Sequence, residues 1–262
     1  MDRVTGWVAK IVFVFLYIPI LAVVVYSFNA SSSARAWDGL SLRWYIELFQ
    51  DRGLIQSLQV SLVVGVITGV AATAIGFLTA LGLIRYRGKG RAFLLGAILL
   101  PLILPEIVLG AALLTVFSTV QLPLGISTIV LGHIVISLPL TTLILMGALG
   151  TLDPSLPEAA ADLGCTPWTT FTRVLFPLMR SAILAAFLLT FTTSFSNIVI
   201  STFASGVGST TLPLRIYSML KTGITPEINA LGTLLIVGTI AIIFAVGIAQ
   251  MRRILAGAGR TP

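Results

Sequence analysis

Long runs of apolar residues, separated by short polar segments, make up most of this chain. A helix needs about 20 apolar residues to cross the hydrocarbon core of a membrane. Six runs approach or exceed this length, at residues 8–28, 57–83, 92–119, 127–149, 181–204 and 229–249. The pattern predicts an all-α polytopic membrane protein with six transmembrane helices, in a single domain over residues 1–262.

The polar segment at residues 151–180 carries the local signals of short helices. Ser155 and Glu158 have the Ser-x-x-Glu spacing of a capping box, in which each side chain bonds to the other residue's backbone amide. Gly164 suits the left-handed position that follows a helix. We therefore expect a helix that begins near Ser155 and stops at Gly164.

A second short helix is predicted directly afterwards. Thr166 is a favourable N-cap residue, and Pro167 is a favourable first residue because the N–H that it lacks has no helical partner there. Pro177 is expected to end this helix. The segment should therefore form a helix, a glycine bend and a second helix.

Composition supports a membrane protein. Hydrophobic residues make up 57% of the chain and charged residues 10%, with a mean hydropathy of +1.06; soluble domains have about 25% charged residues. The sequence has no Gly-x-x-x-x-Gly-Lys-Ser/Thr phosphate loop, and six spans leave no room for a nucleotide-binding domain. Any ATP hydrolysis is therefore expected on another polypeptide.

Basic residues indicate the orientation of the chain. With the N terminus inside, the inner segments hold eleven Lys and Arg residues and the outer segments hold five. The positive-inside rule predicts that both termini and residues 151–180 lie in the cytoplasm. This asymmetry and anionic lipid explain the net charge of +7, so the charge gives no reason to expect nucleic-acid binding.

Glu106 is the acidic residue that lies well inside a predicted span. A carboxylate near the bilayer centre costs at least about 2.5 kcal/mol unless it is neutral, paired or hydrated. Glu106 therefore either lines a substrate pathway or makes a structural hydrogen bond. Pro101 and Pro105 could break the same helix, and broken helices line cavities in many transporters.

The fifth run carries a polar cluster, formed by Thr190, Thr192, Thr193, Ser194, Ser196 and Asn197. Hydroxyls bond readily to helix carbonyls or to a neighbouring helix, so a structural role explains the Ser and Thr residues equally well. Asn197 is the hardest to explain in this way. Ser194, Ser196 and Asn197 thus join Glu106 as candidates for a substrate pathway.

Two singly occurring residues give little reason to expect chemistry. His133, in the fourth run, has no second His or Cys with which to bind a metal, and helix packing is the favoured interpretation. Cys165 is the single cysteine, so the chain forms no internal disulfide. Without a His or basic partner, its thiol is expected to be inert.

The spacing in residues 151–180 resembles the EAA loop of ABC importer permeases. Glu158-Ala159-Ala160 is followed by Gly164 and Val174, and Phe176 stands where that family usually has Leu before Pro177. Such a loop docks on an ATPase. The resemblance implies an ATPase-coupling site formed by Glu158, Ala159, Ala160, Gly164 and Pro177, whereas an ordinary capped cytoplasmic loop is the alternative.

Most of the remaining chain is similar to spermidine/putrescine-type permeases, and more to the second of their two permease subunits. The similar stretches are Leu-Tyr-Ile-Pro-Ile at 16–20, Ser-Phe-Asn at 27–29, Pro-Glu-Ile-Val at 105–108, Leu-Pro-Leu-Arg-Ile-Tyr-Ser-Met at 212–219 and Thr-Pro-Glu-Ile-Asn-Ala-Leu at 225–231. The resemblance implies a type I ABC importer permease in a bacterial inner membrane. Its implied partners are two ATPase subunits, a homologous six-helix permease and a periplasmic solute-binding protein, with ATP and Mg on the ATPase and no cofactor on this chain.

One departure from that family bears on the substrate. Polyamine permeases have a Ser-x-Asp-Asp stretch in the fifth span, where this chain has Ser194-Phe195-Ser196-Asn197. Two anions that could attract an ammonium group are therefore missing, although Glu106 retains one. Overall similarity favours a polyamine, and 4-aminobutyrate or an opine remains open.

Two other classes compete with the importer permease. In an ion- or proton-coupled secondary carrier, Glu106 would be the cation site and no docking loop would be needed. A membrane enzyme fits less well. The sequence has no evident nucleophile and base pair, metal-ligand cluster or phosphate-binding loop.

Overall fold

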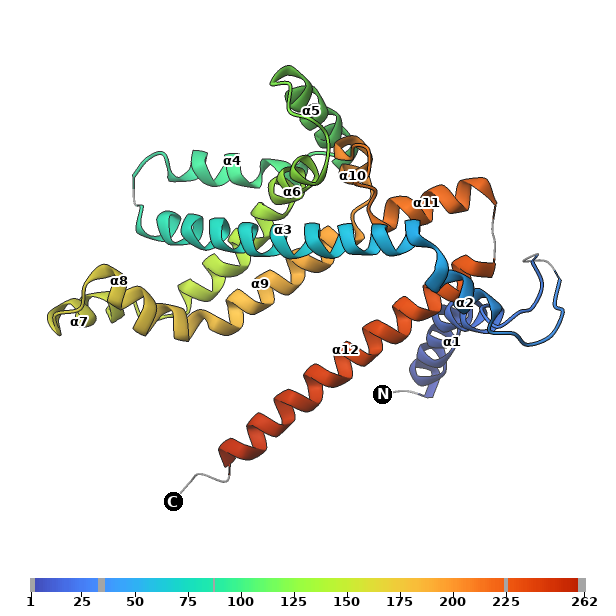
Figure 1. Ribbon diagram of the computed structural model, residues 1–262. Coiled ribbons are helices and arrows are strands. Elements are labelled where there is room, and N and C mark those ends of the chain that lie inside the picture. Colours follow the sequence, from blue (N-terminus) through green and yellow to red (C-terminus); the bar gives the residue numbers. More distant parts are fainter. Residues whose placement is uncertain (1–2, 33–35, 87, 224–225, 259–262) are drawn as a thin grey trace. The chain divides into compact units, whose positions relative to one another are not determined.

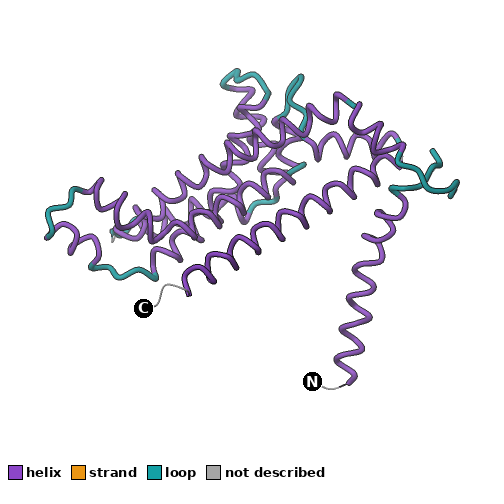
Figure 2. The backbone as a smooth tube through the Cα atoms, turned by 60° about the horizontal axis from the view of Figure 1, so that its bottom comes forward, coloured by secondary structure: helices purple, strands orange, loops and turns teal. Residues whose placement is uncertain are grey.

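A computed structural model describes residues 3–32, 36–86, 88–223 and 226–258. Within these ranges the regular elements are helices (Figure 2). One isolated β-bridge joins Asn29 and Leu40. The helices are α1 (Arg3–Tyr26), α2 (Arg43–Gln50), α3 (Arg52–Arg85), α4 (Arg91–Ile103), α5 (Glu106–Thr119), α6 (Ile126–Gly150), α7 (Leu156–Asp162), α8 (Pro167–Thr170), the π-helical turn η1 (Phe171–Leu175), α9 (Phe176–Ser196), α10 (Val199–Ala204), α11 (Leu212–Thr222) and α12 (Pro226–Ala258). Some residues used in the sequence predictions lie outside the described ranges: Arg35, Arg87, Thr225 and Arg260. The all-α prediction is confirmed for the described residues.

Four helices are long and apolar enough to cross a membrane within the described residues. They are Thr5–Tyr26, Arg52–Arg85, Ile126–Gly150 and Pro167–Ser196. The bent pair α4 and α5 makes a fifth if it counts as one span, and Pro226–Ala241 is a shorter apolar helix in the region of the sixth predicted span. A multi-pass membrane protein is therefore confirmed, whereas the count of six stays a prediction.

The third predicted span is broken at a proline. The axes of α4 and α5 differ by 107° across Leu104 and Pro105. Pro105 cannot donate a helical hydrogen bond, and its ring pushes the preceding residue out of the α region. Leu104 has the extended backbone that this clash requires, with ψ of 141°. Pro101, by contrast, lies inside α4 without ending it.

The prediction that residues 181–204 form one continuous membrane span is wrong. Helix α9 ends at Ser196, Asn197 is extended, and the chain turns into the separate helix α10. The hydrophobicity of residues 198–204 could not reveal this break, because α10 is as apolar as a membrane span. The break depends on tertiary hydrogen bonds of Asn197, described below.

The prediction that Pro177 ends a helix is also wrong. The helix that begins at Pro167 runs on through Pro177 to Ser196. The π-helical turn η1 lies immediately before Pro177, and its capping bond joins the amide of Phe176 to the carbonyl of Phe171. A π-turn inserts an extra residue and so changes which carbonyl faces the proline ring, which lets the helix continue.

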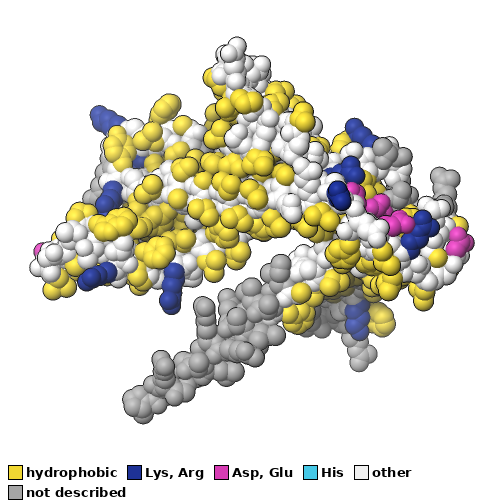
Figure 3. All heavy atoms as spheres, viewed as in Figure 1, with side chains coloured by type: hydrophobic (Ala, Val, Ile, Leu, Met, Phe, Trp, Pro, Cys, Tyr) yellow, Lys and Arg dark blue, Asp and Glu magenta, His cyan; other side chains and the backbone are white. Residues whose placement is uncertain are grey.

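The described chain forms two compact units, residues 1–55 with 216–262 and residues 56–215. The second unit contains the side-by-side helices α3, α6 and α9, with α7 and α8 at one end (Figure 1). Glycines allow the close approach of α3: a Cβ at Gly69 would lie 2.8 Å from the ring of Phe187, and one at Gly76 would lie 2.9 Å from Thr141. Hydrophobic side chains gather over the middle of α3 in the face shown in Figure 3.

The first unit packs α12 against α1 and α2. Its polar centre is Asn29, which is fully buried: its Nδ2 donates to the carbonyl of Ala36, its Oδ1 accepts from the amide of Asp38, and its carbonyl accepts from Nε1 of Trp44. Helix α1 is apolar and exposed along its length. Such a helix is typical of a membrane span.

Candidate functional site

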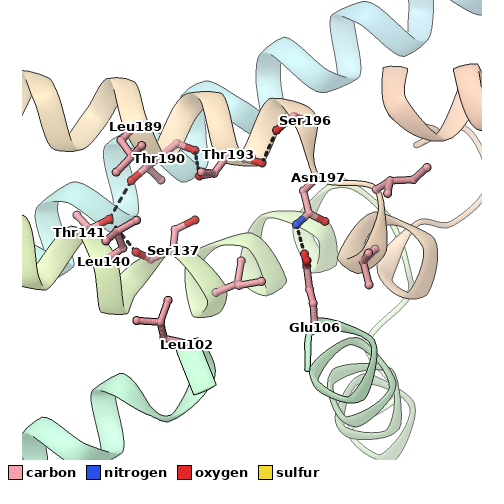
Figure 4. Close-up of a pocket in the computed structure, with 14 residues that line it drawn as sticks. Leu102, Glu106, Ser137, Leu140, Thr141, Leu189, Thr190, Thr193, Ser196 and Asn197 are labelled. Carbon is pink, nitrogen blue, oxygen red and sulfur yellow. Dashed lines mark hydrogen bonds between the residues drawn. The ribbon is translucent and has the colours of Figure 1, made fainter. Parts of the chain in front are cut away.

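The two helix breaks of the second unit meet at one hydrogen bond. Glu106 is the first residue of α5, directly after the break at Pro105, and Asn197 lies in the break between α9 and α10. Nδ2 of Asn197 donates to Oε1 of Glu106 (Figure 4). The positive end of the α5 dipole also favours a carboxylate at this position. The two breaks therefore bring a carboxylate, an amide donor and a helix N terminus together inside a membrane-spanning unit.

A cavity of about 380 Å³ opens beside this pair. Its wall is formed by one carboxylate, one amide, several hydroxyls and apolar side chains from α4, α5, α6, α9 and α10, and the four candidates Glu106, Ser194, Ser196 and Asn197 all line it. This volume lies within the roughly 300–1,000 Å³ of small-molecule sites. The structure therefore brings the four sequence-predicted residues to one cavity.

Ser137 is a cavity residue that the sequence analysis did not select as a candidate. It is buried on α6 and lines the cavity, and its hydroxyl has no hydrogen-bond partner among the described residues. Buried polar groups normally have a partner in the protein or in solvent. Ser137 thus contributes a buried hydroxyl without a partner among the described residues to the cavity lining.

The other hydroxyls are more fully satisfied. Ser196 donates to the carbonyl of Thr192, and Thr193 donates to that of Thr190, as expected for hydroxyls absorbed by their own helix. Thr141 and Thr190 share a hydrogen bond of 2.9 Å between α6 and α9. Ser194 is buried and bonds to His133. Of the predicted pathway residues, Ser194 is buried, Glu106 and Asn197 are half-buried, and Ser196 is exposed.

The loop at residues 151–180, called the docking loop below after its predicted role, has the predicted glycine bend. Gly164 has φ of +78°, the amide of Cys165 donates to the carbonyl of Ala160, and the amide of Gly164 donates to that of Ala161. These two bonds form a Schellman motif, which satisfies the last carbonyls of α7. Thr166 caps α8 by accepting from the amide of Thr169, with Pro167 as the first helical residue. Both predictions are confirmed.

The predicted capping box of Ser155 and Glu158 is wrong. Ser155 has helical backbone angles, and its side chain makes no cap bond to α7. Its amide and hydroxyl instead donate to Oδ1 of Asp153, at 2.9 and 2.7 Å. These bonds hold the pKa of Asp153 below its ordinary value. Glu158 is therefore free of a capping role, and its side chain is exposed.

The docking loop presents an acidic and apolar surface. Glu158 and Ala159 are exposed, and so are two large apolar side chains, Leu163 (85% exposed) and Trp168 (72%). Ala160 is buried beneath them, and Pro177 is exposed in the first turn of α9. The sequence analysis missed Leu163 and Trp168, although large apolar residues in a polar loop were a detectable signal.

An aromatic chain connects the docking loop to the helix core. The ring of Phe171, in the π-turn, lies 5.7 Å from that of Trp168 and 5.7 Å from that of Phe77 on α3. Phe77 belongs to the core cluster that α3, α6 and α9 share, with Leu145 and Met179. The loop is therefore in direct aromatic contact with the packed helices.

A hollow of about 660 Å³ lies between the loop and the ends of α3 and α6, with Arg85 and Glu158 both on its wall.

Cys165 is half-buried and not disulfide-bonded. Among the described residues, no group of three His, Cys, Asp or Glu side chains could hold a metal ion.

Comparisons with known proteins agree with this architecture. Residues 72–256 match the family described as "Binding-protein-dependent transport system inner membrane component". The chain is 38% identical to the spermidine/putrescine transport system permease protein PotC of Haemophilus influenzae, over 89% of this chain and 91% of that protein. It is 38% identical to the putrescine transport system permease protein PotI of Escherichia coli, over 88% of this chain and 84% of that protein.

A solved structure shares the fold. A chain of a bacterial ABC transporter involved in the import of the acidic polysaccharide alginate superimposes with a TM-score of 0.72, covering 94% of both chains at 15% identity. The same transporter type has been solved with an alginate-bound periplasmic protein, with a TM-score of 0.71 and coverage of 92% and 91%. At this identity the likeness concerns the fold.

Proposed function

Because this chain belongs to the family of inner membrane components of binding-protein-dependent transport systems, we propose that it forms half of the translocation path of an ATP-driven importer for a polyamine. The chain is a multi-pass inner membrane permease. Its proposed partners are a homologous permease, two ATPase subunits that bind ATP and Mg, and a periplasmic solute-binding protein. The match to PotC and PotI, whose names specify spermidine and putrescine, supports the substrate class.

The observation that carries this proposal is the carboxylate of Glu106 on the cavity wall. An ammonium group that leaves water loses several kcal/mol of solvation even after relaxation, unless negative charge replaces it. Glu106 supplies one such charge, and the last turn of α9, from Thr193 to Ser196, adds the partial negative charge of helix carbonyls.

The docking loop supports the proposal that a partner ATPase drives transport. Glu158, Leu163 and Trp168 offer an exposed surface to an ATPase in the cytoplasm. When that ATPase moves, Phe171 carries the displacement to Phe77 and so to α3. The translocation path then opens alternately to the two sides of the membrane. An ion-coupled carrier would need neither this loop nor a binding protein, and family membership supports the ATP-driven mechanism.

The test is import of labelled putrescine into proteoliposomes that contain the complete transporter, with the binding protein saturated. We expect Glu106→Gln to reduce import about tenfold or more, because the amide keeps the size and the Asn197 contact but removes the charge. The binding protein's own affinity should not change. ATPase activity without substrate should also stay near the wild-type rate.

The matched control is Glu47→Gln, the same change at the exposed Arg43–Glu47 pair of α2, where an ion pair contributes little. Equal import by Glu106→Gln and wild type would remove Glu106 from the pathway. Loss of putrescine import with full retention of 4-aminobutyrate import would establish that Glu106 recognises the net positive charge of the dication, since the zwitterion carries an ammonium group as well. Preferred import of 4-aminobutyrate by the wild type would reject the polyamine.

A further inference from the structure

One histidine spans the break between α9 and α10. His133 lies on α6 and is fully buried. Its Nδ1 lies 2.7 Å from Oγ of Ser194, which precedes the break, and its Nε2 lies 3.2 Å from Oγ of Ser201, which follows it. The ring therefore holds both sides of the break.

The surrounding bonds specify the tautomer of this ring. The hydroxyl of Ser201 donates to the carbonyl of Asn197 at 2.9 Å. Because its one proton is used there, Oγ of Ser201 accepts a hydrogen bond from Nε2–H. A neutral imidazole then leaves Nδ1 as an acceptor for the hydroxyl of Ser194. The neutral Nε2–H tautomer satisfies every bond in this group.

The same bonds lead to the cavity carboxylate. The carbonyl of Asn197 is held by Ser201, its Oδ1 accepts from the amide of Ile200 at 2.9 Å, and its Nδ2 donates to Glu106. Backbone and side chain of Asn197 are thus both fixed. A change at His133 reaches Glu106 through two intermediate residues.

We propose that His133 is a positioning residue for the cavity: as a neutral Nε2–H imidazole, it fixes the Asn197 turn so that the amide points at Glu106. The effect on import rests on the proposed function of the cavity. The opposite end of α10 is held separately, by the hydroxyl of Thr128, which donates to the carbonyl of Ala204 at 2.7 Å. His133 therefore controls the end of α10 that faces the cavity.

The first test reads the tautomer directly and does not depend on transport. The chain has a single histidine, so ¹⁵N-histidine labelling of the complete complex, without histidine tags, gives the His133 signals as a difference from the His133→Gln complex. We expect a protonated Nε2 and an unprotonated Nδ1. An Nδ1–H tautomer or a doubly protonated ring at neutral pH would overturn the proposal.

The second test uses the reach of amide side chains. In His133→Gln the side-chain N–H can occupy the place of Nε2, whereas in His133→Asn it falls near Nδ1 and does not reach Ser201. We expect His133→Asn to raise the KM for putrescine import about tenfold, the usual cost of a lost buried hydrogen bond. His133→Gln should stay within about threefold of wild type.

A double-mutant cycle separates positioning from packing. If His133 acts through Asn197 on Glu106, the effect of His133→Asn on KM should disappear in a Glu106→Gln background. An undiminished effect there, or a wild-type KM for His133→Asn, would overturn the proposal. If Glu106→Gln alone imports normally, the cavity function fails, and the ¹⁵N signals still decide the tautomer and with it the inference.

Discussion

The docking loop and the cavity are built from contacts of different range. In the loop, Thr169 bonds to Thr166, Cys165 to Ala160 and Ser155 to Asp153, all within five residues along the chain. At the cavity, Asn197 bonds to Glu106 and Ser194 to His133, across 91 and 61 residues. The hydrogen bonds that shape the loop are local, whereas the cavity exists only when distant helix breaks meet.

The largest effect is expected from a substitution that destroys the local geometry of the loop. Gly164→Val places a β-branched residue at φ of +78°, which costs about 1–3 kcal/mol and displaces the docking surface. We expect ATP-driven import to fall at least about tenfold, because a loop that is misplaced by this strain docks poorly. The measurement is import in proteoliposomes, together with co-purification of the ATPase.

Gly164→Asn is the matched control, because asparagine tolerates the left-handed conformation. It should retain most of the import. Wild-type import by Gly164→Val, in a complex shown to be assembled, would mean that the bend does not position a docking surface.

An intermediate effect is expected from substitutions at Asn197, which forms the long-range hydrogen bond with Glu106 in the cavity. Asn197→Asp replaces the amide donor with a second carboxylate beside Glu106. The two acids share a proton when the cavity is empty, and a dication that releases this proton gains two negative charges, so the pair favours a dication over a zwitterion. Together with Ser196→Asp, the substitution should raise the selectivity for putrescine over 4-aminobutyrate about tenfold, the value of one favourable charge contact of 1–2 kcal/mol. Competitive uptake of the two labelled compounds measures this ratio.

The two single variants separate the contribution of Ser196 from that of Asn197. Ser196 is exposed and bonds to its own helix, so Ser196→Asp alone should shift the ratio less than Asn197→Asp. The reverse order would show that Ser196, and not the pair at the helix breaks, faces the substrate. An unchanged ratio in the double variant would exclude both positions.

The smallest effect on import is expected from a substitution that disturbs the packing of α10 against α6. A Cβ at Gly132 would lie 2.6 Å from Cγ2 of the buried Ile200, so Gly132→Ala must push α10 away from α6. Overpacking of this kind costs about 1–3 kcal/mol. We expect a lower melting temperature of the assembled complex, with a moderate rise in the KM for import.

Gly147→Ala on the same helix is its control, since a Cβ there meets no atom within 4 Å. This variant should be as stable as the wild type, or slightly more stable because alanine favours helix. Equal melting temperatures for the two variants would show that α10 is not held tightly against α6.

The failures of sequence prediction have local physical causes. The Ser155–Glu158 spacing suits a capping box, but Asp153 lies two residues before Ser155 and binds both its amide and its hydroxyl. Pro177 does not end its helix because the π-turn accommodates the ring. In each case the same residues are compatible with two local structures. The residue pattern alone does not show which of the two is more stable.

The sequence by itself determined the membrane class, the apolar character of the long helices and the caps at Gly164 and Thr166, and it offered Pro101 and Pro105 as two possible breaks. These features depend on hydrophobicity and on backbone preferences that act within a few residues. Only the tertiary structure decided that α9 breaks at Asn197, that Asn197 meets Glu106, and that His133 joins both sides of the break. Those contacts require α5, α6, α9 and α10 to pack together, because a buried amide or imidazole finds its partner only when distant segments bring one within hydrogen-bond reach.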